Sequence, residues 1–159
     1  MLKRSKRRRN LRQQRPAPRK AFLSHAASDR SFVDRLAKLL RAHGVPTWYS
    51  SEDLVGAQQW HDRIGRALQQ CGWFVLVLSP QSVRSRWVRR ELMYALDAPR
   101  YEERIVPVLY RTCNSDRLSW VLKSFQRVDF TRGFDNGAKQ LLKVWGKRHK
   151  RPKDNGWHR

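Results

Sequence analysis

Six apolar residues without a break decide the fold of this chain: Trp73-Phe74-Val75-Leu76-Val77-Leu78. Gly72 precedes the run and Ser79-Pro80 follows it. A short apolar run bounded in this way predicts a strand that is buried on both faces, as in a parallel sheet covered by helices. Ligands of such sheets bind at the strand ends that lead into helices. The residues after Leu78 are therefore the first place to look for a site.

The segment after this strand predicts a helix from 84 to about 97, which Ser82 or Ser85 can cap. Trp87 and Glu91 stand at positions i and i+4 of that helix. Residues at this spacing lie one above the other on one helix face. We therefore expect an aromatic ring and a carboxylate to open onto the same crevice at the end of the central strand.

The rest of the chain alternates strands with helices. Further strands are predicted at 21–24, 45–49, 105–110 and 126–130, and further helices at about 30–43, 60–70, 118–122 and 134–145. Helices between successive strands favour a parallel sheet with right-handed crossovers. The predicted fold class is α/β: a flavodoxin-like five-stranded parallel sheet of order 2-1-3-4-5, with helices on both faces.

The formal net charge of +22 is concentrated at the two ends of the chain of 159 residues. Residues 1–20 hold ten Lys or Arg and no acid, and residues 143–159 hold seven and one Asp, against eighteen basic and twelve acidic residues between them. Chain ends of this composition cannot bury enough apolar surface to become ordered. We predict a basic disordered tail at 1–19, one globular domain at 20–146 and a basic C-terminal tail at 147–159. The tails make nucleic acid or an anionic surface a candidate weak partner.

The two cysteines, Cys71 and Cys113, have no metal-ligand spacing and are too few for a disulfide framework. No apolar segment follows the basic N-terminus, and no window approaches the ~18 apolar residues of a membrane span. We therefore expect a soluble protein in the reducing cytoplasm, without a membrane span.

Several chemistries known on this scaffold lack their motifs here. The loop after the first strand, residues 24–29, contains no glycine, which excludes a Gly-x-Gly-x-x-Gly dinucleotide site, and there is no P-loop. A phospho-receiver domain needs acids at the ends of its first and third strands, where this chain has Ser24-His25 and Ser79-Pro80. The Gly-x-Ser-x-Gly elbow of serine hydrolases is missing, and the five histidines are scattered. No metal site is predicted.

Three motifs in order resemble the Toll/interleukin-1 receptor (TIR) domain family in its bacterial NAD-cleaving form, over about residues 20–146. They are Phe22-Leu23-Ser24-His25 with Ser28-Asp29, then Glu52-Asp53-Leu54-Val55-Gly56 leading to Trp60 and Ile64, then Leu78-Ser79-Pro80 with residues 85–92. The resemblance implies one of two activities. Many bacterial members cleave the nicotinamide N-glycosidic bond of NAD+ to give ADP-ribose or a cyclic ADP-ribose isomer, often in antiphage defence. Others are noncatalytic adaptors that act through TIR–TIR contacts.

The resemblance implies that Glu91 is the catalytic residue and that NAD+ is a substrate rather than a cofactor. Nicotinamide leaves a positively charged pyridinium as a neutral molecule, so a strong general acid is dispensable and one carboxylate can suffice. Glu91 would hold the ribose hydroxyls and stabilise the cationic sugar. Whether water or the substrate's own adenine attacks stays open, and with it the choice between hydrolysis and cyclisation.

Six further residues are expected to bind the substrate: Trp87, Phe22, Ser24, Ser79, Arg86 and Asp29. Four of the six have a structural alternative. Trp87 and Phe22 can be core residues, Asp29 a helix cap and Ser79 the polar end of a buried strand, while Glu91 itself can be a solvated helix residue. Some NAD-cleaving relatives carry arginine where this chain has Ala26-Ala27, so Arg30 or Arg86 would have to supply that contact.

Two other functions stay open beside the enzymatic one. The chain can be a noncatalytic module that recruits another TIR domain, or a nucleic-acid binder that acts through its basic tails. The resemblance also implies a homo-oligomer in which the loop at 50–56 of one chain completes the site of the next. Without a fused sensor, a separate sensor protein is an expected partner.

Overall fold

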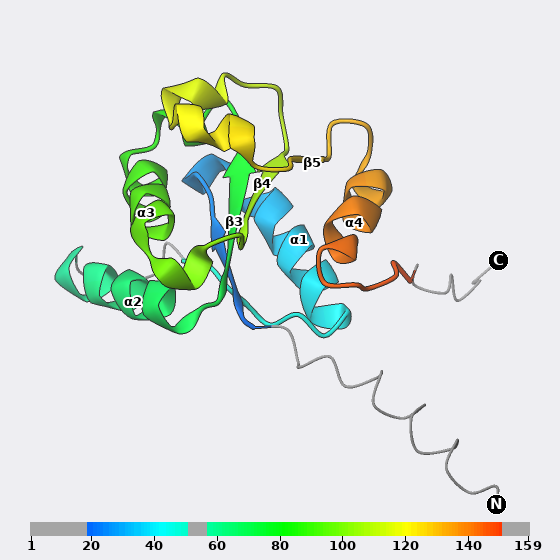
Figure 1. Ribbon diagram of the computed structural model, residues 1–159, viewed down its shortest axis with the longest axis horizontal. Helices are drawn as coiled ribbons and strands as arrows, with labels where there is room; N and C mark the ends of the chain where they lie inside the picture. The colour runs from blue at the N-terminus through cyan, green and yellow to red at the C-terminus, as the bar shows by residue number, and fades with distance from the viewer. Residues whose placement is uncertain (1–18, 51–56, 151–159) are drawn as a thin grey trace, which may run out of the picture.

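The computed structural model describes residues 19–50 and 57–150, with the backbone alone at 57–60. Its centre is a five-stranded parallel sheet in the order β2-β1-β3-β4-β5 (Figure 1). The strands are β1 (Ala21–Ser24), β2 (Thr47–Trp48), β3 (Trp73–Leu78), β4 (Ile105–Leu109) and β5 (Val128–Asp129). The predicted fold class and strand order are confirmed.

The central strands have nearly the predicted lengths, but both edge strands are shorter. β2 pairs with β1 at Thr47 and Trp48 only, and β5 pairs with β4 at Val128 and Asp129 only. Pro46 has no N–H to donate, which limits the ladder at the start of β2, although its carbonyl accepts the Ala21 N–H at 2.8 Å. The proline correctly indicated an edge strand.

Four α-helices cover the sheet within the described residues: α1 (Arg30–Ala42), α2 (Ala57–Gln70), α3 (Arg86–Asp97) and α4 (Phe134–Lys143). In Figure 1, α1 and α4 lie on one side of the sheet and α2 and α3 on the other. Gly44 closes α1 with φ 78°, as predicted for a residue just past a helix end.

The short helix predicted around 118–122 is present as 3-10 helix rather than as α-helix. The chain forms two 3-10 segments, Ser115–Arg117 and Trp120–Ser124. The Asn114 side chain accepts the Asp116 N–H at 3.2 Å, and the Ser119 hydroxyl accepts the Val121 N–H at 3.3 Å. Such local bonds offer the backbone an alternative to the α-helical pattern.

β3 separates two apolar cores, because its side chains alternate between the faces of the sheet. Val75 and Val77 pack with α1 and α4, whereas Phe74, Leu76 and Leu78 pack with α2 and α3. A Cβ at Gly137 would lie 2.4 Å from the Phe130 ring, so α4 approaches the sheet through a position that only glycine fits. The two cores hold α1 and α3 at fixed places beside the central strands.

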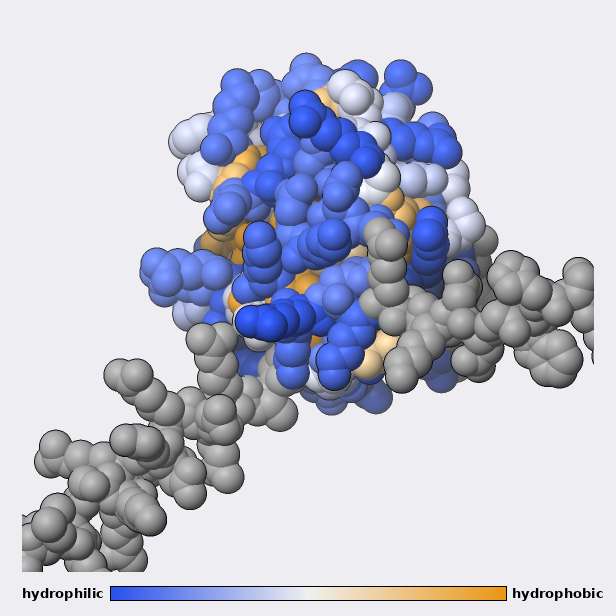
Figure 2. Space-filling model, turned by 90° about the vertical axis from the view of Figure 1, so that its right-hand side faces the viewer, coloured by the Kyte–Doolittle hydropathy of each residue, from blue (hydrophilic) through white to orange (hydrophobic). Residues whose placement is uncertain are grey.

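The outer face on the α4 side is mostly hydrophilic (Figure 2). Beyond α4 the described chain continues to Lys150, whose N–H donates to Nε2 of His43 at 3.1 Å. Across 19–50 and 57–150, no helix has both the length and the apolar character that crossing a membrane requires. Cys71 and Cys113 are free thiols. The domain boundaries at 19/20 and 146/147 stay predictions.

Candidate active site at the carboxyl edge of the sheet

The carboxyl ends of β1 and β3 lie side by side, because the strands are parallel and Ser24 pairs in register with Leu76. Ser24 shares a strand face with Phe22, which packs in the core beneath α2 and α3. The Ser24 hydroxyl therefore points to the side of the sheet that α3 covers. Ser85 begins α3 by accepting the Val88 N–H at 3.3 Å, which confirms one of the two predicted caps.

Glu91 lies on the buried face of α3 and is only 6% exposed. Burial raises the pKa of its carboxyl to about 8, and the neighbouring Ser24 hydroxyl offsets this only in part. Glu91 therefore holds its proton at neutral pH. Its Oε2 and the Ser24 Oγ have no hydrogen-bond partner of ordinary geometry, although both are buried. Buried polar atoms without partners are rare and costly, so this pair of atoms marks a place for a ligand.

Asp29 and Ser79 are also buried, but they are bound to each other. The Ser79 hydroxyl donates to Oδ2 of Asp29, and it accepts the Ser82 N–H at 3.0 Å. Asp29 occupies the position before α1, yet its side chain makes no capping hydrogen bond. The helix-cap interpretation of Asp29 is therefore wrong, and its predicted contact with substrate stays a prediction.

The aromatic candidates lie in different environments. Trp87 is half-buried, with its ring edge-on to His61 at 4.8 Å between centroids and the Arg90 guanidinium 5.3 Å from its centre. Phe22 is 1% exposed and stacks on Trp48 and Phe74 at 5.0 and 5.6 Å. The structure thus places Phe22 in the core and Trp87 in a half-buried position on α3, one turn before Glu91.

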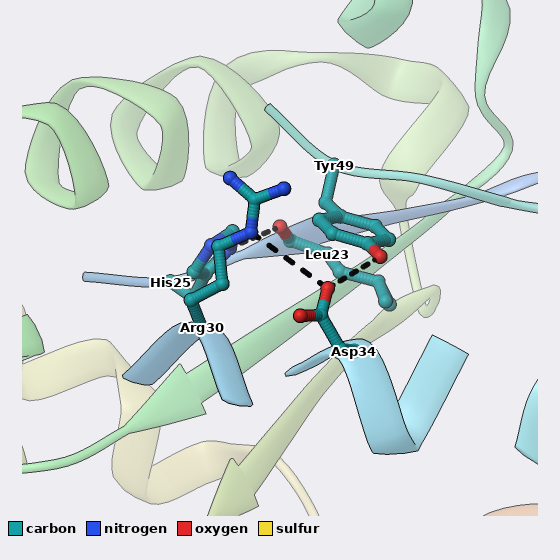
Figure 3. Close-up of polar contacts among 5 residues, drawn as sticks. All are labelled: Leu23, His25, Arg30, Asp34 and Tyr49. Carbon is teal, nitrogen blue, oxygen red and sulfur yellow. Dashed lines mark hydrogen bonds and ion pairs between the residues drawn. The ribbon is translucent and has the colours of Figure 1, made fainter. Parts of the chain in front are cut away.

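A polar cluster lies between the end of β1 and the first turns of α1 (Figure 3). Asp34 accepts the Tyr49 hydroxyl at 2.7 Å and lies 3.7 Å from Nε of Arg30. The Nδ1–H of His25 donates to the Leu23 carbonyl at 3.1 Å, which leaves Nε2 of the neutral ring as an acceptor. Burial lowers the pKa of His25, so this ring is neutral at pH 7.

The two candidate arginines differ in their placement. Arg30 belongs to this cluster, through its ion pair with Asp34 and the Tyr49 ring 5.9 Å from its guanidinium. Arg86 is exposed at the first position of α3. The loop at 52–56 lies outside the described residues.

The structure therefore brings Ser24 and Glu91 together and joins Asp29 to Ser79, while Phe22 is packed in the core and Arg86 is exposed. Ser82 and His25 were missed as participants. The spacing Ser79-Pro80-Gln81-Ser82 could have indicated a hydroxyl pair that closes a turn, and His25 directly follows the first strand. All of these site roles stay predictions.

Two surface grooves lie elsewhere. One of about 510 Å³ runs between α3 and the 3-10 segments and includes Met93 and Trp120 in its lining, and one of about 620 Å³ lies between β4, β5 and α4. None of the predicted site residues lines either groove. Within 19–50 and 57–150, no group of three His, Cys, Asp or Glu side chains is placed to hold a metal ion. The candidate site is thus defined by buried, unpartnered polar atoms.

These features define a class: a flavodoxin-like α/β domain with one buried carboxylate and a tryptophan on the helix that follows its central strand. The sequence model of the TIR domain family matches residues 21–142, which is more than half of the chain. The protein belongs to the TIR domain family.

Three curated relatives resemble the chain at modest identity. The NAD(+) hydrolase PdTIR of Paracoccus denitrificans (strain Pd 1222) is 28% identical over 133 residues, covering 80% of this chain and 44% of the relative. The 2′ cyclic ADP-D-ribose synthase BtTIR of Bacteroides thetaiotaomicron is 31% identical over 72 residues, covering 45% of this chain and 25% of the relative. The probable 2′ cyclic ADP-D-ribose synthase TcpO of Methanobrevibacter olleyae is 24% identical over 90 residues, with shares of 56% and 26%. The chain spans less than half the length of each.

Solved structures share the fold. The TIR domains of the activated Roq1 resistosome give a TM-score of 0.63 at 20% identity, covering 80% of this chain and 99% of that one. The TIR domain of the Toll-related receptor TRR-2 from Hydra magnipapillata gives 0.58 at 18%, with 78% and 88% covered. A prokaryotic SEFIR domain gives 0.56 at 14%, with 79% and 97% covered.

Proposed function

We propose that this protein cleaves the N-glycosidic bond between nicotinamide and ribose in NAD+. The products are nicotinamide and ADP-ribose or a cyclic ADP-ribose isomer. The observation that carries the proposal is the buried carboxyl of Glu91, whose unpartnered Oε2 lies beside the unpartnered Ser24 hydroxyl. Relatives named as an NAD(+) hydrolase and as cyclic ADP-ribose synthases support the choice of substrate.

The two unpartnered atoms suit the hydroxyls of a ribose ring. A ribose diol offers both donors and acceptors, so it can satisfy Ser24 Oγ and Glu91 Oε2 together. The positive charge of the nicotinamide-bearing sugar favours the ionised carboxylate, because an opposite charge nearby lowers the pKa of a carboxyl. Binding of the positively charged nicotinamide end of NAD+ is therefore what converts neutral Glu91 to its charged form.

The negative charge of Glu91 then stabilises the transition state, in which positive charge develops on the sugar. The bond from C1 of the ribose to nicotinamide breaks with its electron pair going to the ring nitrogen, which leaves neutral nicotinamide and a cationic sugar. A carboxylate in a site that excludes water stabilises that cation more than the same group would in solvent. Glu91 can finally accept the proton that the attacking group releases, whether water or the adenosine part of the substrate attacks.

Trp87 is half-buried on α3, one helical turn before Glu91. We assign it to the nicotinamide or adenine ring, since aromatic planes stack on both. NAD+ is the substrate in this proposal, and the reaction uses no further cofactor.

We further propose that the protein works in the cytoplasm in antiphage defence, as copies that assemble through TIR–TIR contacts and respond to a separate sensor. The family resemblance supports this setting. The alternative of a noncatalytic interaction module keeps the same assembly without the chemistry.

The test is nicotinamide release from NAD+ by the full chain, separated by liquid chromatography, for the wild type, Glu91→Ala and Glu102→Ala. Glu102 is an exposed glutamate and serves as the matched control. The proposal expects release by the wild type and Glu102→Ala, and none by Glu91→Ala. Equal release by all three would show that Glu91 is not the catalytic residue, and no release by concentrated wild-type protein would favour the interaction module.

A nucleic-acid role of the basic tails is tested separately. Deletion of residues 1–19 should abolish retention on immobilised nucleic acid across a salt gradient if that role exists, because phosphate contacts are strongly salt-dependent. Undiminished retention would contradict a site carried by the N-terminal tail.

A further inference from the structure

One hydrogen bond joins two loops at the carboxyl edge of the sheet. Ser79, directly after β3, donates its hydroxyl to Asp29, which lies fifty residues earlier in the chain. The two residues are 0% and 2% exposed. The Ser82 hydroxyl accepts the Ser79 N–H at 2.8 Å and donates to the Ser79 carbonyl at 3.1 Å. The turn after β3 is therefore closed on itself and tied to the loop after β1.

The hydrogen bond from Ser79 holds the Asp29 side chain in a position from which it does not cap α1. An aspartate before a helix usually caps it, which contributes about 1 kcal/mol. Asp29 makes no such bond to α1. A buried carboxylate is costly unless it is hydrogen-bonded, so the bond from Ser79 is what allows Asp29 to be there. Its geometry serves the connection between the loops rather than the start of the helix.

The hydrogen bond between Ser79 and Asp29 links two chain segments that also meet at Ser24 and Glu91. From Ser79 the chain passes through the 3-10 segment Ser82–Arg84 to Ser85, which caps α3, and α3 carries Glu91. From Asp29 the other loop runs back to Ser24, the last residue of β1. Ser24 and Glu91 meet at the far ends of these two segments. The bond from Ser79 to Asp29 therefore connects the loop after β1 to the turn that leads into α3.

We propose that Asp29 and Ser79 are positioning residues, which hold the first loop against the turn before α3 and so keep Glu91 beside Ser24. They act without touching the substrate. For its kinetic consequence, this inference rests on the proposed NAD+ cleavage. It replaces the sequence-based expectation that both residues contact the ligand.

The test uses the full chain with three substitutions. Ser79→Ala removes the donor, Ser79→Thr keeps it, and Ser124→Ala is the matched control. The Ser124 hydroxyl is exposed and donates to the Val121 carbonyl at 2.7 Å. Two quantities are measured for each protein: kcat and KM for nicotinamide release, and the titration of the Glu91 carboxyl carbon by NMR in protein labelled with ¹³C-glutamate. The second readout does not depend on activity.

Ser79→Ala is expected to lower kcat by about tenfold or more while KM changes less than about twofold. The substitution disturbs the placement of Glu91 but leaves the contacts that bind substrate in place. Loss of the hydrogen bond to Asp29 lets water reach α3, so the Glu91 titration moves downward from about 8 by roughly one unit or more. Ser79→Thr and Ser124→Ala should match the wild type in both readouts.

A raised KM with an unchanged Glu91 titration would overturn the inference, since Ser79 would then contact the substrate. Unchanged values of both quantities would overturn it as well. If the wild type releases no nicotinamide but Ser79→Ala still shifts the titration, the positioning role stands and the proposed function fails. If Ser79→Ala does not fold by circular dichroism, Asp29→Asn decides. Its amide oxygen still accepts from Ser79, so kcat should stay within about threefold, and a larger fall with an unshifted Glu91 titration would contradict positioning.

Discussion

The carboxyl edge of the sheet buries two carboxyl groups in opposite ways. Asp29 is 2% exposed and accepts a hydrogen bond from Ser79, whereas Glu91 is 6% exposed and has an oxygen without a partner. Burial raises the pKa of Glu91 to about 8, and no cation pairs with its carboxyl in the described structure. Asp29 lies just before α1 and Glu91 lies on α3, and only Glu91 has a carboxyl oxygen without a partner.

This difference distinguishes Asp29, which supports the fold, from Glu91, which is the candidate for catalysis. A buried polar group with its partner in place rigidifies the fold, while one without a partner is destabilising until a ligand supplies the missing bond. Glu91 is buried on α3 together with the apolar residues Val88, Leu92 and Ala95, and this burial favours the neutral carboxyl by raising its pKa. Glu91 is therefore a destabilising buried group in the unbound protein, and under the proposed function the cationic ribose of the substrate supplies its missing partner.

The largest expected effect is the loss of nicotinamide release when Glu91 can no longer ionise. Glu91→Gln keeps the size of the side chain but cannot ionise, so nicotinamide release should fall by roughly a thousandfold or more, the scale of a lost transition-state charge. Asp29→Asn should stay within about threefold, because the amide still accepts from Ser79. Chromatography of the reaction products checks both. Comparable losses in the two variants would mean that both acids take part in the chemistry.

The second effect concerns stability against pH. Folded Glu91 keeps its proton up to pH about 8, while the unfolded chain releases it near 4.5, so the folded state binds more protons between these values. Stability should therefore fall as pH rises through this window, by about 1.4 kcal/mol per pH unit from this group. Glu91→Gln should remove that decline and be the more stable protein at pH 8. Urea unfolding at pH 5 and pH 8 measures it, and parallel declines in both proteins would contradict the burial of an uncompensated carboxyl.

The smallest effect concerns the half-buried ring beside Glu91. Trp87→Ala should raise KM for NAD+ by roughly three- to tenfold, the value of one lost stacking contact. Trp120→Ala is the control, because that ring is 79% exposed and lies in the groove on the outer side of α3. Steady-state kinetics of the two variants compare them. Equal KM values would place Trp87 in packing alone.

Most of the fold could be predicted because the apolar pattern and the turn chemistry agree. The run at 73–78 became the central strand, Gly44 ended the first helix, and Pro46 indicated an edge strand. The difference at 118–122 came from local hydrogen bonds. The side chains of Asn114 and Ser119 bond to nearby backbone N–H groups and favour 3-10 segments where a regular helix was expected. The spacing of apolar residues does not reveal such bonds.

The candidate site was less accessible from sequence, because its key property is a lack of partners. Spacing could place Glu91 one turn after Trp87, but it could not indicate that the carboxyl is buried or that the Ser24 hydroxyl is unpartnered. Nor could it join Asp29 to Ser79, since that contact depends on the register of β1 against β3. Such long-range geometry exists only in the folded chain.

The measurement that tests the central claim most directly is the pH profile of kcat/KM for nicotinamide release by the full chain. This ratio reports the ionisation of the free protein. If Glu91 must ionise to stabilise the sugar cation, kcat/KM should rise by about tenfold per pH unit at low pH and level off near 8, where its carboxyl titrates. The profile of kcat alone should level off at lower pH, because bound cationic substrate favours the carboxylate. A kcat/KM that is flat from pH 6 to 9 in an active protein would contradict the assignment of Glu91.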